Sequence, residues 1–330
     1  MRSDDTSDMD SILIVAHGSS EDLNGDAAPI YAGHLSASLG RKVHHAYKSG
    51  IEPSLETALR GIASEEPDRI VVLPFFFAPG IFADRFVPKM FGLGPGERSG
   101  RVDLDGRNVD VVIAEAFGIH PDMRAVVERI VESNAPKDGR TTVMLIGHGS
   151  KDPANRETVE LNAGYVRDMG FETVCCYNEF DSPTVEEGLK QALATGCDNI
   201  VAIPAFTSSS HHSVVEIPGK LGLDVGQKEG TVGHVRLIYT TEIGLSPGME
   251  DVLMEEYRAL RRSVELPPDD HIVHRIEHDE IYEHHGHRDP RDVPPERGSA
   301  DYLRRVRQRK SPDDVTDDRG QSAHREDGTA

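Results

Sequence analysis

The sequence predicts an α/β protein built from two duplicated units, each with a parallel sheet, that face each other across a cleft and precede a disordered tail. Three observations support this fold. A unit of about 130 residues occurs twice, β-rich runs alternate with helical stretches in each copy, and apolar periodicity stops near residue 263. The predicted divisions are residues 1–136, residues 137–262 and a tail of residues 263–330.

The duplication begins with two apolar runs that both end in His-Gly-Ser. They are residues 12–19, ILIVAHGS, and residues 143–150, VMLIGHGS. Further segments match at a nearly constant offset: 52–56 with 182–186, 68–74 with 198–204, 86–88 with 216–218, and 115–121 with 241–247. One ancestral unit has therefore been copied.

Helical periodicity lies between these runs, at residues 54–64 and 123–133 in the first copy and at 184–194 and 248–261 in the second. Strands that alternate with helices predict βαβ crossovers and parallel sheets with helices on both faces. Such sheets bind ligands at the carboxyl ends of their strands. Both His-Gly-Ser motifs, and both loops that follow a run ending in Pro, are expected at that edge.

Composition excludes several kinds of protein. A balance of 36 Lys and Arg against 57 Asp and Glu gives a net charge of −21, which argues against nucleic-acid or anionic-membrane binding and suits a halophilic protein in concentrated salt. The longest apolar run, residues 70–83, contains prolines and falls short of the roughly 20 residues that span a membrane. An acidic N-terminus and three cysteines without Cys-x-x-Cys spacing, Cys175, Cys176 and Cys197, favour a reducing cytoplasm.

Histidines at the predicted sheet edge indicate a metal site in the second copy. His17 and His148 each follow a strand and precede a glycine, which lets the backbone turn and expose the ring. The loop of residues 207–218 adds His212 and Glu216 to the same edge. Neutral imidazoles bind divalent cobalt, nickel or iron, and a carboxylate acts as ligand, orienter or proton acceptor. We expect His148, His212 and Glu216 to bind metal and catalyse, with His17 as a further candidate.

The first copy carries apolar residues where the second has ligands. Phe82 and Phe86 occupy the positions of His212 and Glu216. These phenylalanines predict an apolar wall that suits a large flat organic ligand. His211, next to His212, is expected to point the opposite way if the loop is extended.

These motifs resemble the class II chelatases, specifically the sirohydrochlorin cobaltochelatases and ferrochelatases. The family pattern has a strand ending in His-Gly-Ser, a strand ending in Pro, and then Gly-x-His-x-x-x-Asp/Glu-Ile-Pro. Residues 210–218 fill that last motif, with Ser210 in place of Gly, and the resemblance covers residues 11–262. It implies insertion of a divalent metal into sirohydrochlorin, cobalt first and then iron, with nickel as another option and no other cofactor. A fused chain of this kind is expected to be an internal pseudo-dimer and monomeric.

The resemblance also implies how a tetrapyrrole would be held. His148 and His212 would bind the metal and accept pyrrole protons, while Glu216 would orient a histidine or relay a proton. The substrate's carboxylates are expected to meet the backbone N–H groups of Ser208, Ser209 and Ser210. The same carboxylates are also expected to meet four basic side chains: Arg85, Lys89, Lys151 and Arg156. The alternative for each of them is a solvated charge on the surface.

A cluster in the tail holds six of the chain's 16 histidines within 17 residues: His271, His274, His278, His284, His285 and His287. We expect it to gather metal ions as a reservoir outside the catalytic site. The main alternative function is a nickel or cobalt metallochaperone without enzymatic activity. A phosphate-binding enzyme is disfavoured, because no glycine-rich phosphate cradle follows either first strand.

Overall fold

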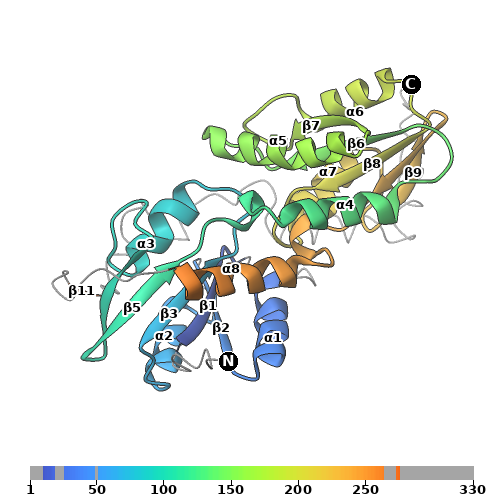
Figure 1. Ribbon diagram of the computed structural model, residues 1–330. Helices are drawn as coiled ribbons and strands as arrows, with labels where there is room; N and C mark the ends of the chain where they lie inside the picture. Colours follow the sequence, from blue (N-terminus) through green and yellow to red (C-terminus); the bar gives the residue numbers. More distant parts are fainter. Residues whose placement is uncertain (1–9, 19–25, 49–50, 264–272, 276–330) are drawn as a thin grey trace, which may run out of the picture. The chain divides into compact units, whose positions relative to one another are not determined.

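The computed structural model describes residues 10–18, 26–48, 51–263 and 273–275 (Figure 1). All of these residues fall within one compact unit of the chain. Each copy of the repeat forms its own sheet with helices packed around it, which confirms the predicted α/β fold. Across the described ranges, no helix combines the length and the apolar character needed to cross a membrane.

The first sheet has six strands in the order β11-β4-β5-β3-β1-β2. The neighbours β2, β1, β3 and β5 pair in parallel, whereas β4 pairs antiparallel with β5. Every residue of β1, which lies between β3 and β2, is buried, as expected of a parallel strand covered on both faces. The strands are β1 (Asp10–Ala16), β2 (Val43–Tyr47), β3 (Arg69–Pro74), β4 (Ser99–Leu104), β5 (Arg107–Ile113) and β11 (Val273–Arg275).

The second sheet repeats this plan with the order β7-β6-β8-β10-β9. Its strands β7, β6, β8 and β10 pair in parallel, and β9 pairs antiparallel with β10. The strands are β6 (Thr141–Gly147), β7 (Glu172–Tyr177), β8 (Asn199–Pro204), β9 (Glu229–Val232) and β10 (Val235–Tyr239). Each sheet is thus mostly parallel with one antiparallel strand, which differs from the fully parallel sheets that the sequence predicts. Two-residue turns explain the difference, because Asp105-Gly106 and Gly233-His234 connect neighbouring strands directly.

The four helical stretches that the sequence predicts all form helices. They correspond to α2 (Leu55–Ala63), α4 (Met123–Asn134), α6 (Val185–Ala194) and α8 (Met249–Ser263). Side-chain caps start several helices, as at Ser54 before α2 and at Thr184 before α6. The remaining helices are α1 (Ala27–Leu39), α3 (Val87–Met90), α5 (Pro153–Asp168), α7 (Ile217–Lys220), the π-helices η1 (Ile81–Phe86) and η3 (His212–Glu216), and the short 3₁₀ turns η2 (Phe117–Ile119) and η4 (Ile243–Leu245).

The last helix of each copy packs against the other copy. α4 contacts α5, and Arg124 of α4 forms an ion pair with Asp168. α8, orange in Figure 1, contacts α1 and β3, and its Glu250 lies 2.8 Å from His34 of α1. The division between residues 136 and 137 therefore separates the two repeats in the sequence. In the folded protein, α4 and α8 each pack against the repeat on the other side of that division.

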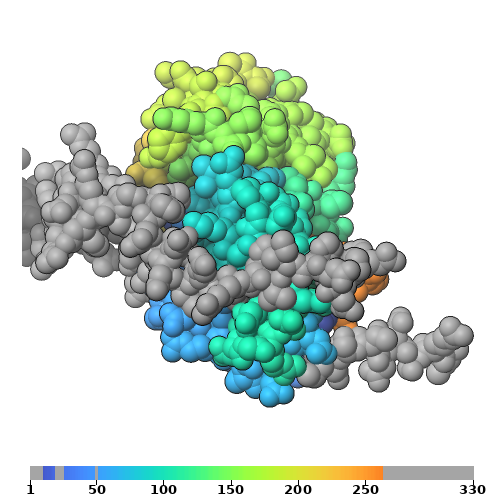
Figure 2. Space-filling model, turned by 90° about the vertical axis from the view of Figure 1, so that its left-hand side faces the viewer, coloured from blue at the N-terminus to red at the C-terminus, as the bar shows by residue number. Residues whose placement is uncertain are grey.

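One hydrophobic cluster includes buried residues of both copies, from β1, α1 and α4 as well as β6, α5 and α8. Two smaller clusters fill the other face of each sheet, one per copy. In the space-filling view, the blue-to-teal surface of the first copy adjoins the green surface of the second (Figure 2). The copies therefore share part of their core, and burial of its apolar side chains stabilises both together.

One segment of the predicted tail is described. β11 pairs in parallel with β4 and forms the edge of the first sheet, so these three residues are part of a strand, while the rest of the tail, for which disorder was expected, lies outside the described residues. The structure gives the backbone of His274 here. The other histidines of this cluster, His271, His278, His284, His285 and His287, lie outside the described residues.

Candidate metal centre

His148 stands immediately after β6, at the carboxyl edge of the second sheet, where it was predicted. Its Nδ1 donates a hydrogen bond to the Gly149 carbonyl at 2.9 Å, so the neutral ring keeps its lone pair on Nε2. Gly149 has φ of 88°, and a Cβ there would lie 1.7 Å from the carbonyl oxygen of Glu179. Glycine is therefore required for this turn, as the His-Gly-Ser motif suggests.

His212 is oriented by Glu216. Both belong to the π-helix η3, and the Nδ1 atom of His212 lies 2.8 Å from Oε2 of Glu216. An ionised carboxylate accepts only, so Nδ1 carries the proton and Nε2 keeps the lone pair. Asn178 donates a second hydrogen bond to Oε2 of Glu216 at 3.0 Å, and Lys220 donates to Oδ1 of Asn178 at 2.7 Å.

These hydrogen bonds keep Glu216 ionised. Burial opposes ionisation, but the bonds from Asn178 and His212 outweigh it and lower the pKa of the carboxyl below its ordinary value. The segment is helical instead of extended, so His211 and His212 both approach the carboxylate of Glu216. The Nε2 atom of His211 lies 3.6 Å from Oε1 of Glu216. The expectation of opposite directions held only for an extended loop, and this segment does not meet that condition.

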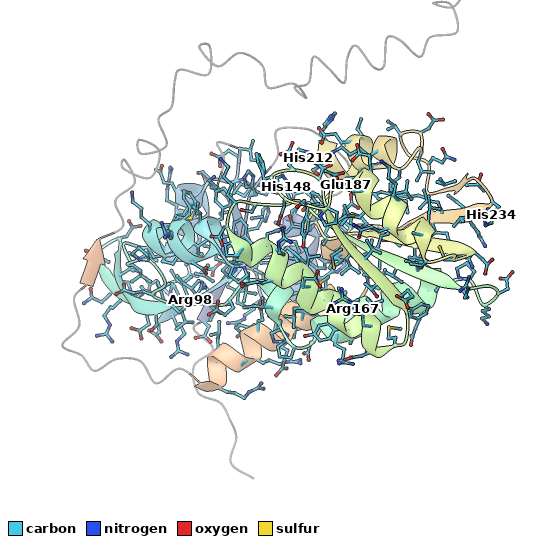
Figure 3. The ribbon with its side chains drawn as sticks, turned by 90° about the horizontal axis from the view of Figure 1, so that it is seen from above. Arg98, His148, Arg167, Glu187, His212 and His234 are labelled. Atoms are coloured by element: carbon cyan, nitrogen blue, oxygen red, sulfur yellow. The ribbon has the colours of Figure 1, made fainter. Side chains whose placement is uncertain are left out.

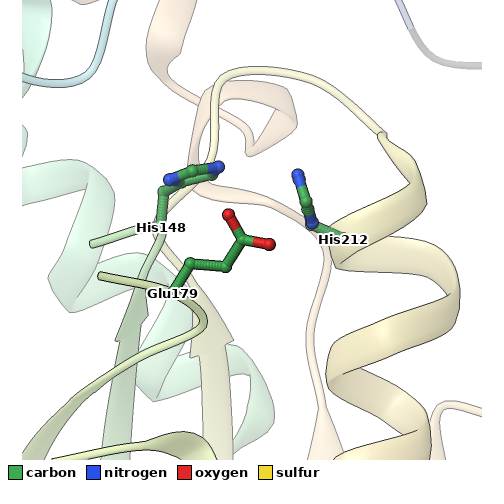
Figure 4. Close-up of side chains that lie close together, drawn as sticks. All are labelled: His148, Glu179 and His212. Carbon is green, nitrogen blue, oxygen red and sulfur yellow. The ribbon is translucent and has the colours of Figure 1, made fainter. Parts of the chain in front are cut away.

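Glu179 is the carboxylate that sequence reasoning missed. One ligand atom each from His148, Glu179 and His212 lie within 4.8 Å of one another, and the three side chains point toward a common point (Figure 4). Glu179 follows β7, and its backbone N–H donates to the His148 carbonyl at 2.9 Å. Two imidazoles and one carboxylate form a suitable ligand set for a divalent transition metal. Glu216 contacts this set through His212.

The first copy brings His17, Phe82 and Lys48 to the equivalent edge. The rings of His17 and Phe82 are 5.2 Å apart, and the Nζ of Lys48 lies 3.7 Å from the centroid of Phe82 and 5.4 Å from that of Phe86. Surrounding protein lowers the pKa of Lys48, because burial disfavours the ammonium. This apolar wall is therefore packed against a cation.

His17 lies near the metal-binding side chains but outside their group. The pKa of its ring is lowered, first by desolvation and then by the positive charges of Lys48 and His148, against a raising effect of the bond to Gly18. The two histidines that end the first strands of the copies therefore influence each other electrostatically.

The predicted substrate-binding residues are spread around this edge. Ser208 accepts a hydrogen bond from the N–H of Ala27, at the start of α1, over 3.2 Å, so it joins the two copies. The N–H of Ser210 donates to Oγ of Ser213 at 3.0 Å, which stabilises the loop itself. Ser209 is half-buried between them.

The four basic candidates are all exposed. Arg85 lies in η1, Lys89 in α3, and Lys151 just before α5. Arg156 forms an ion pair with Asp181 and lies over the ring of Tyr177 at 5.3 Å. Arg156 is thus already held by protein groups.

His234 and the cysteines of β7 lie outside the group of candidate metal ligands. Figure 3 shows His234 in the β9–β10 turn, well away from the adjacent His148 and His212. The cysteines of β7 are buried, and burial raises the pKa of Cys175 to about 12.

The chain resembles known proteins along both copies. A family model described as CbiX matches residues 11–134 and 142–260. A sirohydrochlorin cobaltochelatase of Methanopyrus kandleri is 45% identical over 84 residues, which are 25% of this chain and 59% of that protein. A sirohydrochlorin ferrochelatase of Priestia megaterium is 26% identical over 263 residues, covering 77% of this chain and 92% of that protein.

The fold also matches a solved structure, SirB from Bacillus subtilis with Fe³⁺. The TM-score is 0.59 at 18% identity, covering 76% of this chain and 94% of that one. This likeness concerns the fold alone. Because the CbiX model matches both copies over most of the chain, the protein belongs to the CbiX family.

Proposed function

We propose that this protein inserts a divalent metal ion into sirohydrochlorin, with cobalt preferred and iron next. The observation that carries the proposal is the convergence of His148, Glu179 and His212 within 4.8 Å at the carboxyl edge of the second sheet. The names of the relatives, sirohydrochlorin cobaltochelatase and ferrochelatase, agree with it. Nickel is a weaker candidate substrate, since imidazole ligands accept all three ions.

The reaction requires two proton acceptors. Each metal ion that enters the macrocycle displaces two pyrrole N–H protons, and no redox step is needed. The Nε2 lone pairs of His148 and His212 first bind the metal, and as the metal passes to the ring nitrogens they become available to accept those protons. Glu216 stabilises the protonated form of His212, because its carboxylate accepts from Nδ1 at 2.8 Å.

Substrate binding follows from the residues around this edge. Phe82 and Phe86 offer apolar contact to the macrocycle, and the backbone N–H groups of Ser208 and Ser209 offer hydrogen bonds to its carboxylates, whereas that of Ser210 already donates to Ser213. Arg85, Lys89 and Lys151 are exposed cations that suit the same carboxylates, whereas the ion pair with Asp181 makes Arg156 the weakest of the four candidates.

The shared hydrophobic cluster supports a monomer that acts as an internal pseudo-dimer. Free, buried cysteines fit a reducing cytoplasm, which we propose as its location. In this proposal the tail histidines gather metal for the centre, and a metallochaperone remains the alternative function.

Absorption spectroscopy tests the proposal. Metal-free sirohydrochlorin should change spectrum faster with the protein and Co²⁺ than with Co²⁺ alone, and Fe²⁺ and Ni²⁺ should rank below cobalt. Glu179→Gln should weaken Co²⁺ binding and slow the reaction about tenfold or more, because it removes an anionic ligand. A metallochaperone would instead bind Co²⁺ without accelerating insertion, and that result would contradict the proposed enzyme.

A further inference from the structure

Phe180 is an aromatic side chain in an unusual environment. It is 65% exposed, more than any other large apolar side chain in the described parts of the chain. Burial of apolar surface drives folding, so a phenylalanine that serves the fold is normally inside the protein. The exposed ring contributes little to the core and is available to a ligand.

The backbone of Phe180 adopts a conformation that phenylalanine disfavours. Its φ is 56°, and among the described residues only Glu66 and Asp105 are other non-glycine residues with positive φ. For a bulky side chain this left-handed region is strained. Such strain persists at positions where a function selects the side chain in spite of it.

The first copy has a glycine at the equivalent position. Tyr47 and Tyr177 correspond, because each N–H donates to the carbonyl of a proline six residues later, Pro53 or Pro183. Counting three residues onward reaches Gly50 in one copy and Phe180 in the other. Glycine carries no such strain at positive φ. The copy with the ligand set therefore has an aromatic residue where the other copy has the conformationally easier one.

The ring of Phe180 lies beside the metal centre. It follows Glu179 directly, and its centroid lies 6.2 Å from that of His148 with an interplanar angle of 28°. Aromatic surface next to a metal ligand can contact a flat conjugated ring, face to face or edge to face. A substrate whose nitrogens must approach the metal brings its ring system to this place.

We propose that Phe180 is a positioning residue that holds the conjugated ring of the tetrapyrrole next to His148 and Glu179. This inference rests on the proposed function, since it concerns the same site. Phe180 supplies apolar contact from the second copy, as Phe82 and Phe86 do from the first. Its strained backbone is maintained for binding, so phenylalanine at this position lowers the stability of the fold while it raises the affinity for the substrate.

The test replaces Phe180 by glycine in the full-length protein. Phe180→Gly should leave the melting temperature equal or higher, because glycine relieves the strain, while KM for sirohydrochlorin rises about tenfold and kcat changes less. Co²⁺ affinity should stay within about twofold of wild type, because no ligand is removed. Phe180→Tyr and Phe180→Trp should restore KM, since both keep an aromatic ring.

Asp105→Gly is the matched control. Asp105 is exposed, has φ of 52° and lies in the turn between β4 and β5, so glycine relieves the same strain there without touching the site. It should leave KM unchanged. A KM for Phe180→Gly within about twofold of wild type would overturn the inference.

Direct binding separates this inference from the proposed function. Titration of metal-free sirohydrochlorin, followed by its fluorescence, measures affinity without metal insertion. If the wild-type protein binds the tetrapyrrole but inserts no metal, the proposed function fails, and a weaker affinity of Phe180→Gly still supports the role of Phe180. If the wild-type protein inserts metal and Phe180→Gly binds as tightly, only the inference about Phe180 is wrong. Absence of binding by the wild-type protein would refute both.

Discussion

The two copies keep the same geometry at their sheet edges but carry different chemistry. In the second copy the rings of His148 and His212 lie 4.9 Å apart at an interplanar angle of 87°, and in the first copy those of His17 and Phe82 lie 5.2 Å apart at the same angle. The fold thus preserves an edge-to-face ring pair, although only one of the pairs has two possible metal ligands.

Lys48 explains why the first copy is unsuited to a metal ion. It corresponds to Asn178, because the two N–H groups donate to the equivalent carbonyls of Ala16 and Gly147. In one copy Asn178 supports Glu216, whereas in the other the Lys48 ammonium lies over Phe82 as a cation–π contact. The first copy therefore holds the Lys48 ammonium at the edge where the second copy is suited to bind a metal cation.

The largest expected effect tests which copy is active. His148→Ala and His212→Ala should each lower the rate of Co²⁺ insertion about a hundredfold or more, because each removes a metal ligand and a proton acceptor. His17→Ala should have a smaller effect, through the electrostatic environment of His148. Circular dichroism would check that all three variants are folded. Full activity of His148→Ala, together with a large loss in His17→Ala, would show that the first copy carries the active site.

A second prediction compares the helices that end the copies. Met123 and Met249 begin α4 and α8, so Ile130 of the first copy corresponds to Glu256 of the second. Glu256 is 5% exposed, and burial, together with the charge of Glu115, raises the pKa of its carboxyl to about 8. The folded state therefore binds the proton more tightly than the unfolded state, and stability should fall as pH rises from about 4.5 to about 8.

Glu256→Gln should remove this loss. Above pH 8 the variant should be more stable than wild type by on the order of a few kcal/mol, and near pH 4 the two should be similar. Urea unfolding at both pH values measures the difference. Asp251→Asn, at an exposed position of the same helix, should change the pH profile little. An equal effect of Glu256→Gln at both pH values would show that the carboxyl does not titrate as described.

The smallest expected effect concerns the apolar wall. Phe82→His alone should add no Co²⁺ equivalent to the wild-type stoichiometry, because Lys48 repels a cation there and residue 86 offers no carboxylate. It should raise KM for sirohydrochlorin roughly threefold, through lost apolar contact. Adding Lys48→Asn, Ser49→Glu and Phe86→Glu should then add one equivalent to the wild-type stoichiometry. An extra equivalent in Phe82→His by itself would contradict the role given to Lys48.

Sequence reasoning reached the fold and most of the metal centre because both depend on local patterns. His148 and His212 were found because each follows a strand whose apolar run is visible in the sequence, and parallel strands end at one edge. Glu179 was overlooked, although it follows β7 and the same rule applies to it. The hairpin strands were also missed, although Asp105-Gly106 is a strong turn signal.

Other features depend on contacts that sequence spacing does not reveal. Glu216 was expected as a ligand or an orienter, and only the π-helix shows its carboxylate on Nδ1 of His212. The crossing of α4 and α8 to the opposite copies leaves no sequence signal, because an apolar helix face fits either sheet. The π-helical turn that brings His211 and His212 to one carboxylate was hidden for a similar reason, since strand and helix periodicities are ambiguous over so few residues.

Because α4 and α8 each pack against the opposite copy, the second copy needs the first one to complete its fold. The first copy contributes α4, which packs against α5 of the second copy, and the second copy contributes α8 to α1 and β3 in return. Neither copy can complete its core alone, so deletion of the first would remove a structural part of the second. The first copy therefore serves the fold of the second even though Phe82 and Phe86 stand at the positions of His212 and Glu216.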